Sequence, residues 1–263
     1  MTRLPTLFVP HGAPTFALHP GAAGAAMVTA AQALPKPRAI VIVSAHWDTA
    51  VATVGFAEQP ETMHDFWGFP DELYTLRYPA KGSGAIAAEV FAVIAAAGLP
   101  VEKDGGRGLD HGAWIPLRLM IPHADVPVVP LSIQSVGGTE QAYRLGQALA
   151  PLAAQGILVI ASGNLTHNLR DYQIAARSGG QTPGYVSEFT DWLAARLAAD
   201  DIPALLDYRR QAPGGVQAHP SDEHLLPLYV ALGAGGQHAR VERFHAGIDD
   251  YVIAMDAYSF APQ

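Results

Sequence analysis

The fold is decided by residues 39–47, which read AIVIVSAHW, and by residues 157–162, which read ILVIAS. Both runs are apolar without alternation, which is typical of strands that are buried on both faces of a parallel sheet. Longer Ala- and Leu-rich stretches with the length of helices alternate with such runs along the chain. This pattern predicts an α/β fold, with a central, mostly parallel sheet flanked by helices on both faces.

The same pattern predicts where the elements lie. We expect strands at Thr6–Val9, Ala39–Ser44, Val51–Phe56, Val126–Ser132, Ile157–Ser162, Ala239–Phe244 and Tyr251–Tyr258. We expect helices at Gly21–Leu34, Gly84–Ala97, Thr139–Ala153, Tyr185–Ala199 and Asp222–Leu232. The runs Arg240–His245 and Tyr251–Ser259 have no helix between them, which predicts an antiparallel edge near the C-terminus. Gly and Pro are spread through the connections, so we expect a single domain over residues 1–263.

Composition limits the classes of function. Of the 263 residues, 49% are hydrophobic and 15% are charged, which provides for a large core. The net charge of -8 argues against nucleic acid or an anionic membrane as the main partner. The sequence has neither an apolar run long enough to span a membrane nor a secretory signal, so we expect a cytoplasmic protein. With no cysteine, any metal must be bound by His, Asp or Glu.

Three histidines follow predicted strands. His11 comes after TLFVP, His46 after AIVIVSA, and His167 shortly after ILVIAS. The carboxyl ends of strands in an open α/β sheet border the crevice in which ligands bind. The sequence therefore places these three side chains at one candidate site.

Two further segments contribute candidates. His111 lies in GGRGLDHGAW, where the preceding Asp110 could orient the imidazole or cap the next helix. In HPSDEHLLPLY, a helix that starts near Asp222 would carry Glu223 and His224 in its first turn, and His224 lies nearer its apolar face. The loop HDFWGFP, from His64, could cover a flat ligand or pack on the sheet. We expect the remaining histidines to be solvated or satisfied in the core: His19, His123, His219, His238 and His245.

Imidazoles with a carboxylate or further imidazole suit Zn(II) or non-haem Fe(II). Histidines beyond the ligands would supply acid–base groups for oxygen chemistry or for hydrolysis. The chain has no G-x-S-x-G elbow and no phosphate-binding glycine motif, which argues against a serine hydrolase and a nucleotide-binding protein.

Seven segments occur in an order that resembles the class III extradiol ring-cleavage dioxygenases, and most closely their DOPA extradiol dioxygenase branch. They are HGAP (11–14), SAHW (44–47), HDFWGFP (64–70), LDHGAWIPLRLM (109–120), ASGNLTHNL (161–169), HPSDEHLLPLYVALGAG (219–235) and YSF (258–260). The resemblance covers nearly the whole chain. It implies a catalytic domain that opens the ring of a small aromatic diol with dioxygen, next to the hydroxyl groups. It specifies no oligomeric state.

The resemblance also implies residue roles. A metal would be held by His11 and His46, with a third ligand from the Glu223–His224 pair. By resemblance to the DOPA-type branch, this third ligand would be His224, whereas protocatechuate-type relatives use a glutamate as the third ligand. His167 matches the acid–base histidine and a fourth ligand of the resting metal, and His111 matches a second active-site histidine.

Iron would serve catalysis, whereas bound zinc would give a resting form, because Zn(II) has no redox chemistry. No organic cofactor is implied. Two departures from the family pattern bear on the substrate. This chain has Ala13 where the family motif HGSP has Ser, and its aromatic loop starts with His64 where the family has Tyr. Two alternatives remain at this point, a zinc hydrolase on the same ligands and a non-catalytic binding protein of the Memo type.

Overall fold

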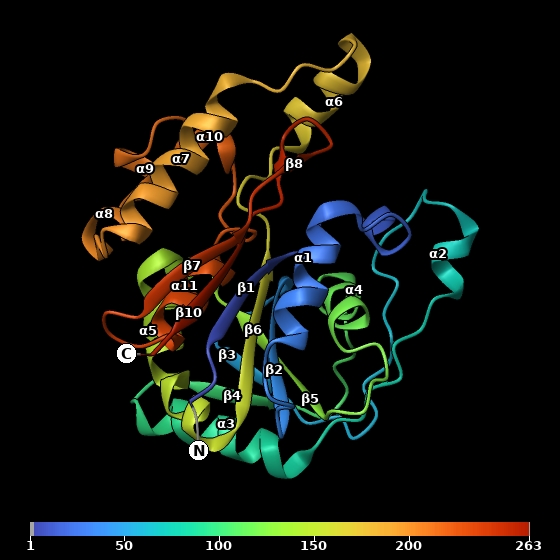
Figure 1. Ribbon diagram of the computed structural model, residues 1–263. Helices are drawn as coiled ribbons and strands as arrows, with labels where there is room; N and C mark the ends of the chain where they lie inside the picture. The colour runs from blue at the N-terminus through green and yellow to red at the C-terminus, as the bar shows by residue number, and fades with distance from the viewer. Residues whose placement is uncertain (1–2, 263) are drawn as a thin grey trace.

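One sheet of eight strands forms the centre of the molecule, in the order β4-β3-β5-β2-β6-β1-β10-β7 (Figure 1). The structure is a computed structural model that describes residues 3–262, so residues 1–2 and 263 of the predicted domain lie outside the described residues. The strands are β1 (Thr6–Pro10), β2 (Ala39–Asp48), β3 (Ala52–Gly55), β4 (Val101–Asp104), β5 (Val128–Ile133), β6 (Ile157–Gly163), β7 (Arg240–His245) and β10 (Ala257–Ala261). A separate pair is formed by β8 (Ile248–Asp249) and β9 (Ile253–Ala254).

The middle of the sheet is parallel and its C-terminal edge is antiparallel. β2 runs parallel to β5 and β6, and β6 runs parallel to β1. β10 pairs antiparallel with both β1 and β7, and β3 is antiparallel to β5. The predicted fold class is therefore confirmed, including the antiparallel edge.

Helices cover both faces of this sheet, and α6 to α10 extend beyond its edge (Figure 1). The helices of the described residues are α1 (Gly21–Gln32), α2 (Asp71–Thr75), α3 (Gly84–Ala96), α4 (His111–Met120), α5 (Gly138–Leu149), α6 (Leu169–Ser178), α7 (Gly184–Ala198), α8 (Ile202–Leu206), α9 (Tyr208–Gln211), α10 (Gly215–Ala218) and α11 (Leu226–Ala234). Short 3-10 turns lie at Pro14–Ala17, Ser135–Gly137 and Ala150–Gln155. α1 and α4 pack together on one face, and α5 and α11 pack together on the other.

The central strands are apolar because both of their faces are covered. Every residue of β1 and β6 is buried, as are residues 39–45 of β2. α11 is buried along its whole length between the sheet and α5. The resulting core fixes the central strands rigidly, and the ends of these strands carry the histidines.

Several predicted boundaries were wrong for local reasons. The helix expected from Asp222 begins at Leu226, after a turn in which the N–H groups of Leu225 and Leu226 donate to the Asp222 carbonyl. The helix expected at Thr139–Ala153 changes to a 3-10 turn at Ala150, where Pro151 lacks an N–H to continue it.

The expected strand Tyr251–Tyr258 was also wrong at its start. Asp250 and Tyr251 have positive φ angles of 48° and 65°, so the chain turns there and joins β8 to β9. β10 then begins at Ala257. The sequence analysis missed β4, β8 and the helices α2, α6 and α8–α10, and it gave no bounds for the helix α4 that it expected after Asp110.

Within residues 3–262, no helix combines the length and the hydropathy that crossing a membrane would require.

Candidate metal centre

Three neighbouring strands, β2, β6 and β1, bring their carboxyl ends to the same edge of the sheet. His11 directly follows β1, His46 lies near the end of β2, and His167 lies in the loop after β6. Parallel strands place such residues close together although they are far apart in sequence. The structure thus brings the three strand-end histidines to one edge, as their placement in the sequence predicts.

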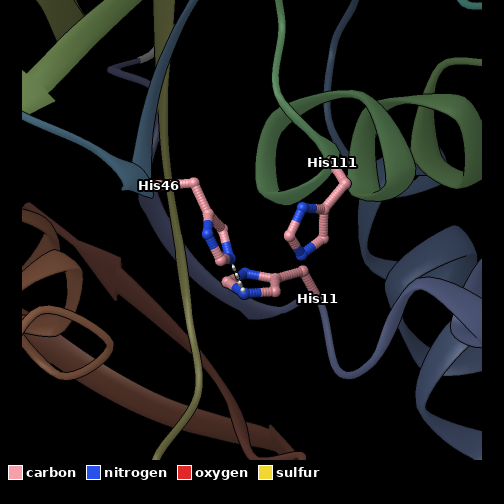
Figure 2. A group of neighbouring side chains, drawn as sticks. All are labelled: His11, His46 and His111. Carbon is pink, nitrogen blue, oxygen red and sulfur yellow. Dashed lines mark hydrogen bonds between the residues drawn. The ribbon is translucent and has the colours of Figure 1, made fainter. Parts of the chain in front are cut away.

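His11 and His46 face each other through their Nε2 atoms, which are 3.1 Å apart (Figure 2). On the other side of the His11 ring, Nδ1 lies 2.9 Å from Ser162 Oγ, within hydrogen-bond distance. Two nitrogens that bind one ion at about 2.0–2.1 Å lie about 2.9–3.4 Å apart, for angles from about 90° to the tetrahedral angle. The separation of the Nε2 atoms therefore suits two ligands of a single ion.

His111 joins this pair from the first turn of α4. Its ring centroid lies 4.0 Å from that of His46 and 5.5 Å from that of His11. One ligand nitrogen from each of the three histidines falls within 4.8 Å of the others. Asp110 caps this helix by accepting from the Ala113 N–H, so it takes the capping role that the sequence left open.

His224 approaches the same place from the turn before α11. Its ring centroid is 5.3 Å from that of His11 and 4.9 Å from that of His46, and its Nδ1 is 3.1 Å from Glu223 Oε1. His224 is buried, as the sequence analysis expected. The reason given there was wrong, because neither Glu223 nor His224 lies on the helix and the turn sets their directions.

His167 completes the cluster by stacking on His224. The loop that carries it is joined to the segment before α11 by two backbone hydrogen bonds, from the His167 N–H to the Ala218 carbonyl and from the Asn164 N–H to the His224 carbonyl. Ligand atoms of His167, Glu223 and His224 form a second group within 4.8 Å. All five histidines named as site candidates therefore lie in two adjoining groups.

Burial keeps four of these imidazoles, those of His11, His46, His167 and His224, neutral at physiological pH. Desolvation, followed by repulsion from neighbouring histidines, holds the pKa of His11 and of His224 well below its ordinary value. Desolvation lowers the pKa of His46 to about 3 and that of His167 to about 4. Neutral imidazoles present lone pairs to a metal without first losing a proton.

The donor set also indicates which ions fit. The two groups contain five imidazoles and the carboxylate of Glu223. Nitrogen and carboxylate donors without thiolate suit non-haem iron or zinc better than Mg(II), which prefers oxygen ligands. Either of these ions is compatible with the geometry of the His11/His46 pair.

The loop HDFWGFP packs beside the cluster. His64 Nε2 lies 3.1 Å from the Leu76 carbonyl and 3.2 Å from Arg77 Nη1, so this ring is held by its own region of the chain. The buried ring of Phe66 meets that of His111 edge to face, with centroids 5.7 Å apart. The loop therefore forms an aromatic wall next to His111.

The sequence analysis missed Asp65, Ser162 and Asn164. Asp65 lies 3.1 Å from His111 Nδ1, and although burial raises its pKa, the contacts with His111 outweigh burial and lower the pKa to about 2. Asn164 Oδ1 accepts from the N–H of Gly12, next to His11. The only sequence feature that pointed to these residues was their closeness to candidate histidines, since Asp65 follows His64 directly and Ser162 and Asn164 lie inside ASGNLTHNL.

Two of the histidines set aside behave as expected. His219 is buried, and its Nε2 lies 2.9 Å from the Leu165 carbonyl. The side chain of His238 is 78% exposed and contacts Asp200.

Comparison with known proteins adds independent findings. Residues 22–258 match the family model of the catalytic LigB subunit of aromatic ring-opening dioxygenase. The chain is 38% identical over 260 residues to 4,5-DOPA dioxygenase extradiol of Beta vulgaris, covering 97% of this chain and 96% of the relative. It is 38% identical over 238 residues to 4,5-DOPA dioxygenase extradiol of Escherichia coli K12, covering 89% and 86%. A crystal structure of an uncharacterized protein from Escherichia coli K12 superposes with a TM-score of 0.81 at 31% identity, covering 98% of this chain and 100% of that one.

Proposed function

This chain belongs to the family of the catalytic LigB subunit of aromatic ring-opening dioxygenase, and from this we propose that it cleaves the ring of a catechol-type diol with dioxygen at a metal ion. It is an extradiol ring-cleavage dioxygenase. The observation that carries the proposal is the pair His11 and His46, whose Nε2 atoms lie 3.1 Å apart beside the rings of His111 and His224. We assign the catalytic domain to residues 1–263.

The proposed ligands are His11, His46 and His224, with His167 as a fourth ligand in the resting protein. Support for His224 comes from Glu223, which lies against Nδ1 and leaves Nε2 as the free nitrogen. Ligating histidines commonly direct their second nitrogen to a carboxylate in this way. His111 also has a carboxylate contact, with Asp65. The competing ligand set, which the experiments must distinguish from the proposed one, is therefore His11, His46 and His111.

Fe(II) is the proposed catalytic metal and Zn(II) a bound resting form. Bound Fe(II) would supply positions for the diol and dioxygen and a path for electrons between them. No organic cofactor is proposed.

The protein's own part in the reaction is to move protons and to keep the site dry. With a pKa of about 4, His167 is neutral near pH 7 and can accept a proton from a diol hydroxyl and return it as the ring opens. His111, whose ring lies against those of both His46 and Phe66, supplies a second imidazole for proton transfer. The buried surroundings exclude water that would compete for these protons.

The proposed substrate class is a small catechol of the DOPA type. The named relatives support it, because those from Beta vulgaris and Escherichia coli are both called 4,5-DOPA dioxygenase extradiol. Ala13 and His64 depart from the family pattern near the site. The catechol screen described next is therefore needed to identify the preferred ring substituent. The comparisons favour a dioxygenase over the zinc hydrolase and the Memo-type binding protein. A cytoplasmic location remains a prediction.

The test is anaerobic loading with Fe(II), followed by a screen of substituted catechols for oxygen uptake. We expect one equivalent of oxygen to be consumed per ring opened, with a yellow semialdehyde acid as product. Zinc-loaded protein and His46→Ala are the controls, and both should be inactive. Absence of oxygen uptake with every catechol, despite a full complement of iron, would contradict the proposal.

A further inference from the structure

Asp65 contacts His111 twice, although the two residues come from different segments. Its Oδ1 accepts a hydrogen bond from the backbone N–H of His111 at 2.8 Å, and its Oδ2 lies 3.1 Å from Nδ1 of the ring. The side chain of His111 is only 8% exposed. Apart from this contact with Asp65, Nδ1 has no hydrogen-bond partner among the described residues, so the Asp65 carboxylate is the acceptor placed to satisfy it.

We propose that Asp65 is a positioning residue that fixes the tautomer of His111, holding the ring proton on Nδ1 so that Nε2 keeps a lone pair. An ionised carboxylate only accepts hydrogen bonds, so the nitrogen next to it must carry the proton. A neutral imidazole has only one such proton, which leaves the other nitrogen as an acceptor. This inference deepens the proposed function, and its activity measurement rests on that function.

The backbone contact makes this arrangement rigid. His111 is the first residue of α4, so its N–H has no acceptor within the helix. By accepting from that N–H, Asp65 is anchored to the same residue whose ring it orients. The carboxylate therefore cannot move away from the ring without leaving a helix N–H unpaired, at a place where negative charge is favoured.

The free nitrogen faces the metal centre. Figure 2 shows one ring nitrogen of His111 directed at His11, on the side of the ring away from Nδ1. A lone pair there can take a proton from a bound diol or join the ligands. The opposite tautomer would direct an N–H at the nitrogens of His11 and His46 and could do neither. The tautomer thus decides whether His111 takes part in the chemistry.

The first test measures the tautomer in the metal-free protein labelled with ¹⁵N-histidine, with His111→Gln used to assign the signals. We expect His111 to carry its proton on Nδ1. In Asp65→Asn the amide oxygen can keep the backbone bond while the NH₂ group faces the ring, so the proton should move to Nε2. A wild-type ring protonated on Nε2, or an unchanged tautomer in Asp65→Asn, would overturn the inference. The wild-type measurement requires neither a folded variant nor activity.

The second test separates positioning from general stability. Asp65→Asn should lower kcat by about 10–100-fold, the usual loss for a residue that orients an active-site histidine. In a His111→Ala background the same substitution should change kcat less than about twofold, because the ring that it orients is absent. An equal loss in both backgrounds would refute the assignment.

A matched control is Asp201→Asn. Asp201 also accepts from a backbone N–H at a helix start, that of Ala204, and pairs with Arg196 rather than with a histidine. It should leave kcat and the His111 tautomer unchanged. A tautomer change in this control would show that the signal reports a general disturbance and would count against the inference.

Discussion

The imidazole rings of His167 and His224 stack face to face, with centroids 3.5 Å apart and ring planes inclined by 8°. A proton on His167 would set a positive charge against a buried neighbour. Burial lowers the pKa of His167 to about 4, with attraction from Glu223 opposing this and repulsion from His111 adding to it. His167 is therefore neutral near pH 7 in the metal-free protein, and its ring is free to accept a proton.

The first prediction concerns His167→Ala. We expect catechol binding to persist and the single-turnover rate to fall by about 10²–10⁴-fold, because a positioned proton donor contributes about that much. Metal content should be measured on the same preparation, with some weakening of resting-state affinity expected. Full activity with full metal would contradict the role of His167, and loss of all metal would make it an indispensable ligand.

The second prediction concerns the facing pair. His11→Ala and His46→Ala should each abolish metal binding, because each removes one of two nitrogens whose 3.1 Å separation suits a shared ion. Elemental analysis of dialysed protein provides the measurement. His238→Ala is the matched control, since this exposed histidine should leave the metal content unchanged. Stoichiometric metal in the His11→Ala/His46→Ala double variant would exclude the site.

The third prediction identifies the remaining ligand. His224→Ala should lose the metal, whereas Glu223→Gln and His111→Ala should keep most of it. The reason is that Glu223 only orients Nδ1 of His224, and a glutamine can still occupy that place. Titration with Fe(II) under anaerobic conditions gives the affinities. If His111→Ala loses the metal and His224→Ala retains it, the ligand set is His11, His46 and His111 instead.

The fourth prediction concerns acid stability of the metal-free protein. Burial lowers the pKa of His46 and of His219 to about 3 and that of His167 to about 4, against 6.5 for a free histidine. Below pH 6.5 these histidines bind protons in the unfolded chain but not in the native protein. The free energy of unfolding therefore decreases as the pH is lowered, until the pH reaches the pKa values of the native state. Each histidine contributes up to about 1.4 kcal/mol per pH unit.

Urea unfolding between pH 7 and pH 5 measures this dependence. His219→Gln should make it shallower by up to about 1.4 kcal/mol per pH unit, because one buried imidazole is removed while an amide N–H remains for the Leu165 carbonyl. His238→Ala should leave the slope unchanged. An identical slope in His219→Gln would show that this ring does not remain neutral in the native state.

Residues 39–47 and 157–162 were sufficient to predict the parallel sheet, because only strands covered on both faces remain apolar without alternation. The positions of His46 and His167 followed from these two strands, and that of His11 followed from the strand TLFVP before it. Their juxtaposition with His224 did not, since a turn at residues 222–225 replaces the expected helix start. The contact of Asp65 with His111 could not be read from periodicity, because it joins two segments 46 residues apart.

The place of β1 in the sheet has a consequence for how the chain folds during synthesis. β1 is synthesised well before its partners β6 and β10, and β10 comprises residues 257–261. At a synthesis rate of about 5–20 residues per second, β10 is completed roughly 10–50 s after β1. His11 follows β1, and its ring contacts Ser162 of β6, so this part of the candidate metal centre cannot form until β6 has been synthesised. Metal loading is therefore expected to follow the pairing of β1 with β6, and the availability of metal should leave the earlier folding steps unaffected.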